Sequence, residues 1–155
     1  MKNLIYICVF LVSSLISQEL KVKSDSFQGD QKKGISVFTG DVKITMGGDR
    51  LQADKVIIYT DSQNQPTKFQ ADGNSAFSIM IEDGSIYNGK AGRIVYLPNK
   101  KEYRFFKNVH LKQTNDKKEI IGEEVVLSTI NGKAYAKGAK NEPVIMIFNI
   151  ADKKK

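Results

Sequence analysis

Residues 38–59 read FTGDVKITMGGDRLQADKVIIY, and this run sets the pattern for most of the chain. Its first half alternates apolar and polar residues, which is typical of a strand with one buried face. The Gly-Gly-Asp sequence at 47–49 separates two apolar runs and predicts a β-hairpin. The second arm contains Asp54 and Lys55 at a point where the alternation breaks, so we expect a bend or a bulge there.

A pair of residues that favour turns, followed by an apolar run, recurs along the chain at nearly equal spacing. The pairs are Gly40-Asp41, Gly73-Asn74 and Lys107-Asn108, and the apolar runs that follow them lie at 56–58, 94–96 and 125–127. We interpret each pair as a turn between short strands. A stacked antiparallel roll, in which each layer buries the apolar face of its neighbour, would have this signature, and so would a meander of hairpins.

The rest of the chain continues the β pattern. We expect strands of about three to seven residues, with turn signals about every eight to twelve residues. The first strand lies at 20–23, residues 27–33 form a loop or a weak strand, and Asn131-Gly132 predicts a type I′ hairpin. A helical period is found only in the N-terminal segment. The sequence therefore predicts an all-β sandwich, barrel or roll.

The N-terminal segment has the composition of an export signal. Lys2 precedes an apolar run at 4–15, which is short for a transmembrane helix, so we predict a secretory signal peptide over residues 1–17. A membrane anchor that is not cleaved is the alternative. Cys8, the only cysteine, lies in this segment, so the mature chain must rely on its core rather than on disulfides. The predicted β domain spans residues 18–150, and a charged tail follows at 151–155.

Charge and motifs limit the chemistry of the protein. A net charge of +7 is compatible with nucleic acid, an anionic membrane or an anionic lipid head group as partner, and also with solubility alone. His110, the single histidine, lies in an alternating strand and is predicted to be a surface residue without a partner. Motifs for a nucleophile, a metal site or a phosphate-binding loop are lacking. We therefore predict a protein that is not an enzyme and binds no metal and no cofactor.

The apolar positions of the strands form a single predicted interior face. They are either a packed core or, in an open roll, a groove for acyl chains, in which each buried CH₂ contributes about 0.8 kcal/mol. The residues of this face are Val42, Ile44, Leu51, Ala53, Phe77, Ile79, Ile94, Tyr96, Val109, Leu111 and Val125.

Two strand-like segments lie at the ends of the β domain. The first contains Leu20 and Val22, and the second contains Val144, Ile145, Met146 and Ile147. In an open roll these would be free edges, which can pair with a strand of another chain. Two different edges on one molecule permit head-to-tail assembly. Alternatively, the neighbouring lysines keep the edges from pairing.

These residues resemble a known family. Phe38-Thr39-Gly40-Asp41-Val42 followed by Leu51-Gln52-Ala53-Asp54-Lys55-Val56 is similar to the central motif of the LptA/OstA family of lipopolysaccharide-transport proteins. Upstream, residues 20–25 are similar to the first strand of that family, and 89–91 and 121–125 match two further elements. Asp41 stands where the family usually has Asn, and Asn74-Ser75 departs from the pattern of the middle copy.

The resemblance implies a fold, a function and partners. The fold is an open antiparallel β-jellyroll, or β-taco, of stacked short strands. The function is a periplasmic carrier that moves lipopolysaccharide from the inner to the outer membrane during outer-membrane assembly, with the lipid A acyl chains in the interior. Leu20 and Val22 match the N-terminal contact strand, and they join the interior residues as expected lipid-binding positions. The implied partners are lipopolysaccharide, an LptC-like inner-membrane protein, an LptD-like outer-membrane protein and further copies of the chain, and they do not include nucleic acid.

Two other functions stay open at this point. One is an LptC-like role in the same transport system, with the N-terminal segment kept as an anchor. The other is a structural β-repeat protein whose interior is merely packed and holds no lipid.

Overall fold

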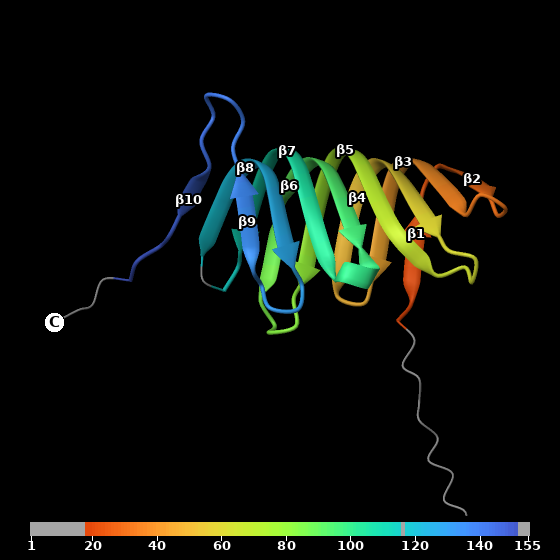
Figure 1. The fold of residues 1–155 in the computed structure, drawn as a ribbon, viewed down its shortest axis with the longest axis horizontal. Helices are drawn as coiled ribbons and strands as arrows, with labels where there is room; N and C mark the ends of the chain where they lie inside the picture. Colours follow the sequence, from red (N-terminus) through yellow and green to blue (C-terminus); the bar gives the residue numbers. More distant parts are fainter. Residues whose placement is uncertain (1–17, 116, 152–155) are drawn as a thin grey trace, which may run out of the picture.

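A computed structural model describes residues 18–115 and 117–151. These residues form one antiparallel sheet of ten strands and a single 3₁₀ turn, η1 (Pro98–Lys100) (Figure 1). The strands are β1 (Leu20–Lys23), β2 (Ser26–Asp30), β3 (Ile35–Met46), β4 (Asp49–Thr60), β5 (Pro66–Met80), β6 (Ile86–Leu97), β7 (Glu102–Gln113), β8 (Lys118–Ser128), β9 (Ala134–Lys137) and β10 (Ile145–Ile147). The all-β prediction is confirmed, and the predicted signal peptide at 1–17 lies outside the described residues.

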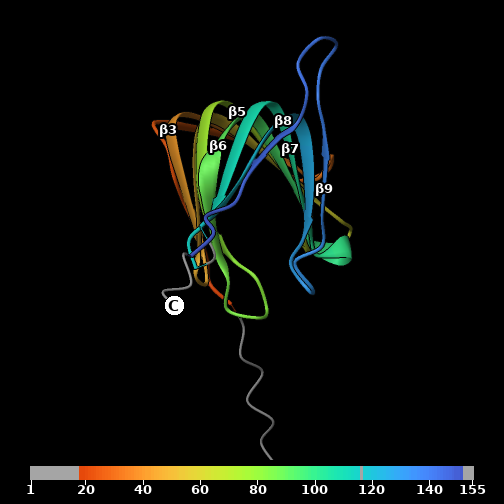
Figure 2. The same ribbon diagram turned by 90° about the vertical axis from the view of Figure 1, so that its left-hand side faces the viewer.

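Strands β3 to β8 are long, with 11 to 15 residues each, so the expectation of short strands is wrong for the centre of the sheet. Each long strand pairs with the next in sequence, but the pairing register shifts near its middle. The strands bend there, and the whole sheet folds over a single ridge (Figure 2). Strand β6, for example, continues without interruption from Ile86 to Leu97.

The recurrent turn pairs lie on this ridge. Gly40 and Asp41 have φ angles of 85° and 43°, and Gly73-Asn74 and Lys107-Asn108 also have positive φ angles. Two successive left-handed residues insert a bulge that bends a strand sharply while the chain continues in the same direction. The predicted repeat is therefore real, but its turns are bends within continuous strands β3, β5 and β7, not chain reversals.

The ridge divides the sheet into two leaves. We call them the β1–β10 leaf and the β2–β9 leaf, after the edge strands that each contains. Between β1 and β10, the first leaf contains the strand segments 42–46, 49–53, 75–80, 86–91, 109–113 and 118–122. Between β2 and β9, the second leaf contains the segments 35–39, 55–60, 66–72, 93–97, 102–106 and 124–128. The turns that join consecutive strands lie opposite the ridge, along an edge that we call the mouth.

The turns and short segments of the chain agree only in part with the predictions. The hairpin predicted at 47–49 is found, with its turn at 47–48 between β3 and β4. Of residues 27–33, expected to be a loop or a weak strand, 27–30 belong to strand β2 and the rest form a turn. The hairpin between β8 and β9 has a loop at 129–133, in which Gly132 has a positive φ angle and Asn131 does not, so it is not the predicted type I′ turn. Among the described residues, no helix is long and apolar enough to cross a membrane.

Candidate functional site

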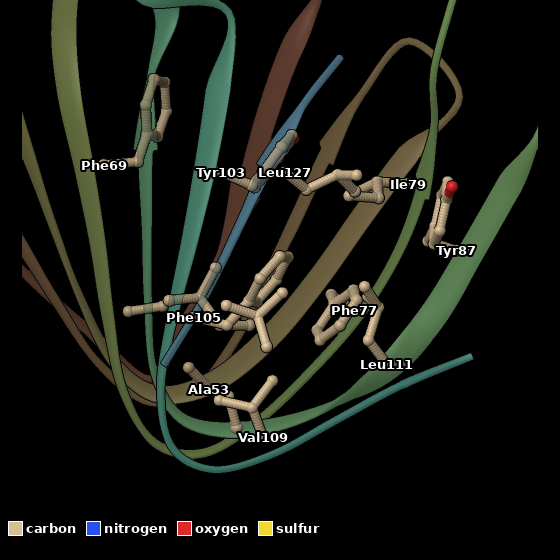
Figure 3. Packing of buried hydrophobic residues seen from close by; sticks show 14 of the residues in the cluster. Ala53, Phe69, Phe77, Ile79, Tyr87, Tyr103, Phe105, Val109, Leu111 and Leu127 are labelled. Carbon is tan, nitrogen blue, oxygen red and sulfur yellow. The ribbon is translucent and has the colours of Figure 1, made fainter. Parts of the chain in front are cut away.

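The predicted interior face is confirmed as the concave face of the folded sheet. Nine of its residues are buried in one apolar cluster, and Leu20, Val22, Leu51 and Tyr96 are half-buried against it. Figure 3 shows side chains from both leaves, including Phe77, Phe105 and Leu111, pointing toward one another. The nine buried residues are Val42, Ile44, Ala53, Phe77, Ile79, Ile94, Val109, Leu111 and Val125.

The cluster also contains residues that were not among those of the predicted interior face. The largest fully buried side chain is Phe105, whose ring stacks on Phe77 with centroids 4.3 Å apart. Tyr103 stacks on Tyr96 at the same separation. Alternation within β7 could have identified them, because Tyr103 and Phe105 point inward while Arg104 and Phe106 point outward. The other omitted members are Val56, Ile58, Phe69, Ala71, Ile81, Tyr87, Ala91, Ile120 and Leu127.

One contact joins the two leaves across the mouth. The phenol of Tyr103, in the β2–β9 leaf, donates a hydrogen bond of 2.7 Å to Oδ2 of Asp49, in the β1–β10 leaf. The other carboxylate oxygen of Asp49 accepts a bond of 2.9 Å from the backbone amide of Met80. Burial, and then the nearby carboxylate of Asp49, raise the pKa of Tyr103 far above its ordinary value. Tyr103 is therefore a neutral hydrogen-bond donor at any physiological pH.

A second set of contacts crosses the mouth near the 81–85 turn. The backbone amide of Glu82 donates to the carbonyl of Thr129, at 2.9 Å. Lys101 forms an exposed ion pair of 3.3 Å with the carboxylate of Glu82, and its own carbonyl accepts bonds from the amide and hydroxyl of Thr129. The turns of the two leaves are thus tied together at two places along the mouth.

The interior is largely filled by its own side chains. The cavity beside the Tyr103–Asp49 contact has a volume of only about 30 Å³, room for about one or two water molecules. Its lining is apolar apart from the residues at the mouth, and it includes Ile44, Leu51 and Ile79. An acyl chain could enter this region only if the side chains and the leaves moved apart.

The two leaves are staggered along the roll. Phe77 of β5 stacks on Phe105 of β7, and Asp49 of β4 bonds to Tyr103 of β7, so β4 and β5 of the β1–β10 leaf contact a later strand of the other leaf. At the β10 end the other leaf covers the inward-facing residues of β8 and β10 only in part. A recess of about 190 Å³ opens there, lined by Ile120, Met146 and Phe148 and, from the other leaf, by Ala134 of β9.

The opposite end has the complementary arrangement. Phe27 of β2 lies on the same inward-facing row as Phe38, with ring centroids 5.1 Å apart, yet Phe27 is 61% exposed. The roll therefore has an apolar overhang of the β2–β9 leaf at one end and an apolar overhang of the β1–β10 leaf at the other.

Four edge strands are free to pair. Each of β1, β2, β9 and β10 has one partner strand within the described residues. The predicted edges around Leu20, Val22 and Ile145 to Ile147 are among them, while Val144 lies just before β10 and packs half-buried against the core. Strands β2 and β9 were not predicted as edges. Ile145, Met146 and Ile147 are all exposed.

The ionisable groups of the outer surface form local pairs. His110 has a partner, contrary to the prediction, because Nε2 lies 3.1 Å from a carboxylate oxygen of Glu119 on the neighbouring strand β8. The hydrogen bond to His110 lowers the pKa of Glu119. Among residues 18–115 and 117–151, no group of three or more His, Cys, Asp or Glu side chains could hold a metal ion.

Comparisons with known proteins agree with this geometry. A family model described as LptA/(LptD N-terminal domain) LPS transport protein matches residues 21–133. The lipopolysaccharide export system protein LptA of Haemophilus influenzae is 27% identical over 111 residues, and the match covers 70% of this chain and 64% of that protein. The crystal structure of LptH, the LptA homologous periplasmic component of lipopolysaccharide transport in Pseudomonas aeruginosa, superposes with a TM-score of 0.76. At 20% identity, it covers 86% of this chain and 96% of LptH, and it shares the fold.

Proposed function

Because the chain belongs to the family of LptA and LptD N-terminal domain lipopolysaccharide-transport proteins, we propose that it is a periplasmic carrier of lipopolysaccharide. It binds the lipid A acyl chains along the concave face and passes the lipid from the inner to the outer membrane. The observation that carries the proposal is the family match over residues 21–133, the part of the chain that builds this continuous apolar face. No enzymatic step is required of it.

Acyl chains would replace contacts that the interior side chains now make with one another. Each CH₂ that is removed from water contributes about 0.8 kcal/mol, so partial insertion of one chain would offset the loss of several such contacts. The recess at the β10 end offers an apolar start for insertion. Breaking the Tyr103–Asp49 hydrogen bond would then widen the mouth. The acyl chains could lie inside while the sugar portion of the lipid stays outside.

The overhangs suggest how partners dock. A strand added to β1 and β2, or to β9 and β10, would extend both leaves of the roll at once. The inward-facing Met146 and Phe148 at one end, and Phe27 at the other, would then be covered by the added leaf. We infer that an LptC-like protein, an LptD-like protein or a second copy of this chain docks at these ends, so that one apolar track continues through the assembly.

Photocrosslinking tests the lipid site. A photoreactive amino acid is placed at Ile44 or at Phe77, which are buried, and at Thr39 as the control, which is exposed on the outer face of β3 in the β2–β9 leaf. Illumination with lipopolysaccharide should give adducts at the two interior positions and none at Thr39. Adducts at Thr39 alone, or at none of the three positions in folded protein, would contradict the proposal and favour a merely packed β-repeat protein.

A cellular experiment tests the bridge. Depletion of the protein should leave lipopolysaccharide behind at the inner membrane, whereas normal delivery to the outer surface would exclude an essential role. N-terminal sequencing of the mature protein separates a cleaved carrier from the LptC-like alternative. A chain that starts after Ser17 in the periplasmic fraction supports the carrier, and an intact Met1 in the membrane fraction supports the anchored form.

A further inference from the structure

The outer face of the β1–β10 leaf carries an unbalanced positive charge. Two rows of outward-facing side chains cross the leaf, and the strand pairing fixes their order. One row runs Lys21, Thr45, Arg50, Ser78, Asn88 and Lys112, and the other runs Lys23, Lys43, Gln52, Ala76, Lys90 and His110.

Most of these cations have no carboxylate partner. Lys43 lies 3.7 Å from Asp41, and Lys112 and His110 share Glu119. By contrast, none of the four cations Lys21, Lys23, Arg50 and Lys90 forms an ion pair with any residue in the described part of the chain. All four are exposed.

On the outer face of the other leaf, the arginines form ion pairs. Arg93 pairs with Asp72, and Arg104 pairs with Glu102 at 2.6 Å, both on the outer face of the β2–β9 leaf. Lysines of that face, including Lys55 and Lys137, also have no ion pair among the described residues, but Asp72, Glu102 and Glu124 lie on the same face and offset much of its positive charge. The two outer faces therefore differ in charge balance although they belong to one sheet. Net charge alone, which serves solubility, would not require this separation.

Two like charges also lie opposite each other at the β1 end of this outer face. Lys23 lies directly opposite Lys43 across the β1–β3 pair, and like charges at directly opposed positions of an antiparallel pair are destabilising. With Lys21 on the same strand and Arg50 on β4, four cations lie on three neighbouring strands. A surface rich in anions would relieve this repulsion.

From this charge pattern we propose that the outer face of the β1–β10 leaf docks on an anionic phospholipid bilayer. A broad sheet face can bring cations of several strands to one charged surface at once, and basic residues near such a surface are attracted to its head groups. The site lies on the opposite side of the sheet from the apolar interior, so it is separate from the proposed carrier site. Docking there would leave the mouth and both ends of the roll accessible.

Vesicle flotation tests the proposal without lipopolysaccharide. The mature protein is mixed with neutral phosphatidylcholine vesicles or with vesicles that also contain phosphatidylglycerol. The test variant carries Lys21→Gln, Lys23→Gln, Lys43→Gln and Arg50→Gln. The control variant carries Lys32→Gln, Lys33→Gln, Lys55→Gln and Lys107→Gln, which removes the same charge from exposed positions of the β2–β9 leaf and the ridge.

The wild type and the control variant should float with anionic vesicles at low salt and not with neutral ones. The test variant should bind about tenfold more weakly or not at all, and added salt should release the wild type, because the attraction is electrostatic. Circular dichroism checks that both variants are folded. If the fourfold test variant is not folded, the measurement is repeated with the double variant Lys23→Gln with Lys43→Gln. Equal losses in test and control variants, or no binding by the wild type, would overturn the proposal while leaving the carrier function untouched.

Discussion

Tyr103 and Asp49, 54 positions apart in the chain, form a 2.7 Å hydrogen bond that joins the two leaves across the mouth. Tyr103 is 4% exposed, and its ring also stacks on Tyr96, so the bond is made at the border between the apolar interior and solvent. Asp49 is held in place from its own leaf by the amide of Met80. The contact therefore links the stability of the roll to the closure of its mouth.

Tyr103→Phe should lower the free energy of unfolding by about 1–3 kcal/mol, because a buried bond to a carboxylate is lost and the ring is kept. Urea unfolding followed by circular dichroism measures the change. Tyr135→Phe is the matched control, since Tyr135 is 61% exposed, and it should change stability by less than about 0.5 kcal/mol. Equal effects of the two substitutions would mean that the mouth contact adds nothing.

The same contact predicts a dependence on alkaline pH. The pKa of Tyr103 is raised in the folded protein, first by burial and then by Asp49, so the folded state keeps a proton that the unfolded state releases above about pH 10. The raised pKa of Tyr103 therefore contributes folding stability that is fully present below about pH 10 and is lost as the pH rises further. The stability difference between the wild type and Tyr103→Phe should therefore shrink in urea titrations between about pH 10 and pH 12. A difference that stays constant over this range would contradict the assignment.

The ridge should be intolerant of side chains at Gly73. A Cβ at Gly73 would lie 2.6 Å from Oδ2 of Asp54, in addition to the cost of a φ angle of 83°. Gly84→Ala is the matched control, because Gly84 has a φ angle of 88° and a Cβ there would meet no atom within 4 Å. We expect a loss of about 1–2 kcal/mol for Gly84→Ala and about 2–4 kcal/mol for Gly73→Ala. Thermal melts of the two variants give the comparison, and a smaller loss at Gly73 would contradict the bend.

Adjacent phenylalanines in β7 should respond very differently to truncation. Phe105→Ala should cost about 3–5 kcal/mol, because the ring is fully buried and stacks on Phe77. Phe106 points to the outer face and is half-buried, so Phe106→Ala should cost about 1 kcal/mol. Chemical denaturation of both variants tests the inward and outward assignment of the strand, and comparable losses would refute it.

The β10 edge should control association. Ile145→Lys with Ile147→Lys places two charges on an exposed edge strand and should abolish any end-to-end oligomers that the wild type forms as its concentration rises. Analytical ultracentrifugation measures this. The control is Met80→Lys with Ile130→Lys, which charges two exposed apolar residues away from the edge strands and should leave association unchanged. Equal losses of association would indicate general hydrophobic contact instead of edge pairing.

Several features were predictable because they depend on neighbouring residues. Alternation along each strand has a period of two, so the inward-facing row that contains Ile44, Phe77 and Leu111 could be read directly from the sequence. The recurrent pairs such as Gly73-Asn74 also had to break the regular strand, because both residues favour left-handed conformations.

Other features depend on how the strands pair, and the sequence left them open. A left-handed pair can reverse a chain or bend it, and only the pairing of both halves of β5 with β4 and β6 makes Gly73-Asn74 a bend. The partner of His110 follows from the register between β7 and β8. The free edge at β2 was missed because Ser26–Asp30 has a weak strand pattern and is held in the sheet by β3.

By itself, the sequence determined the all-β class, the inward-facing residues and the positions where the strands break, since each depends on a local pattern. Only the tertiary structure decided that the sheet folds into two staggered leaves, that Tyr103 meets Asp49, and that four cations without ion pairs share the outer face of the β1–β10 leaf. The physical reason is that these relationships join residues far apart in the chain. They arise from strand register and from the direction of each bend, and both are fixed by the packing of the whole sheet.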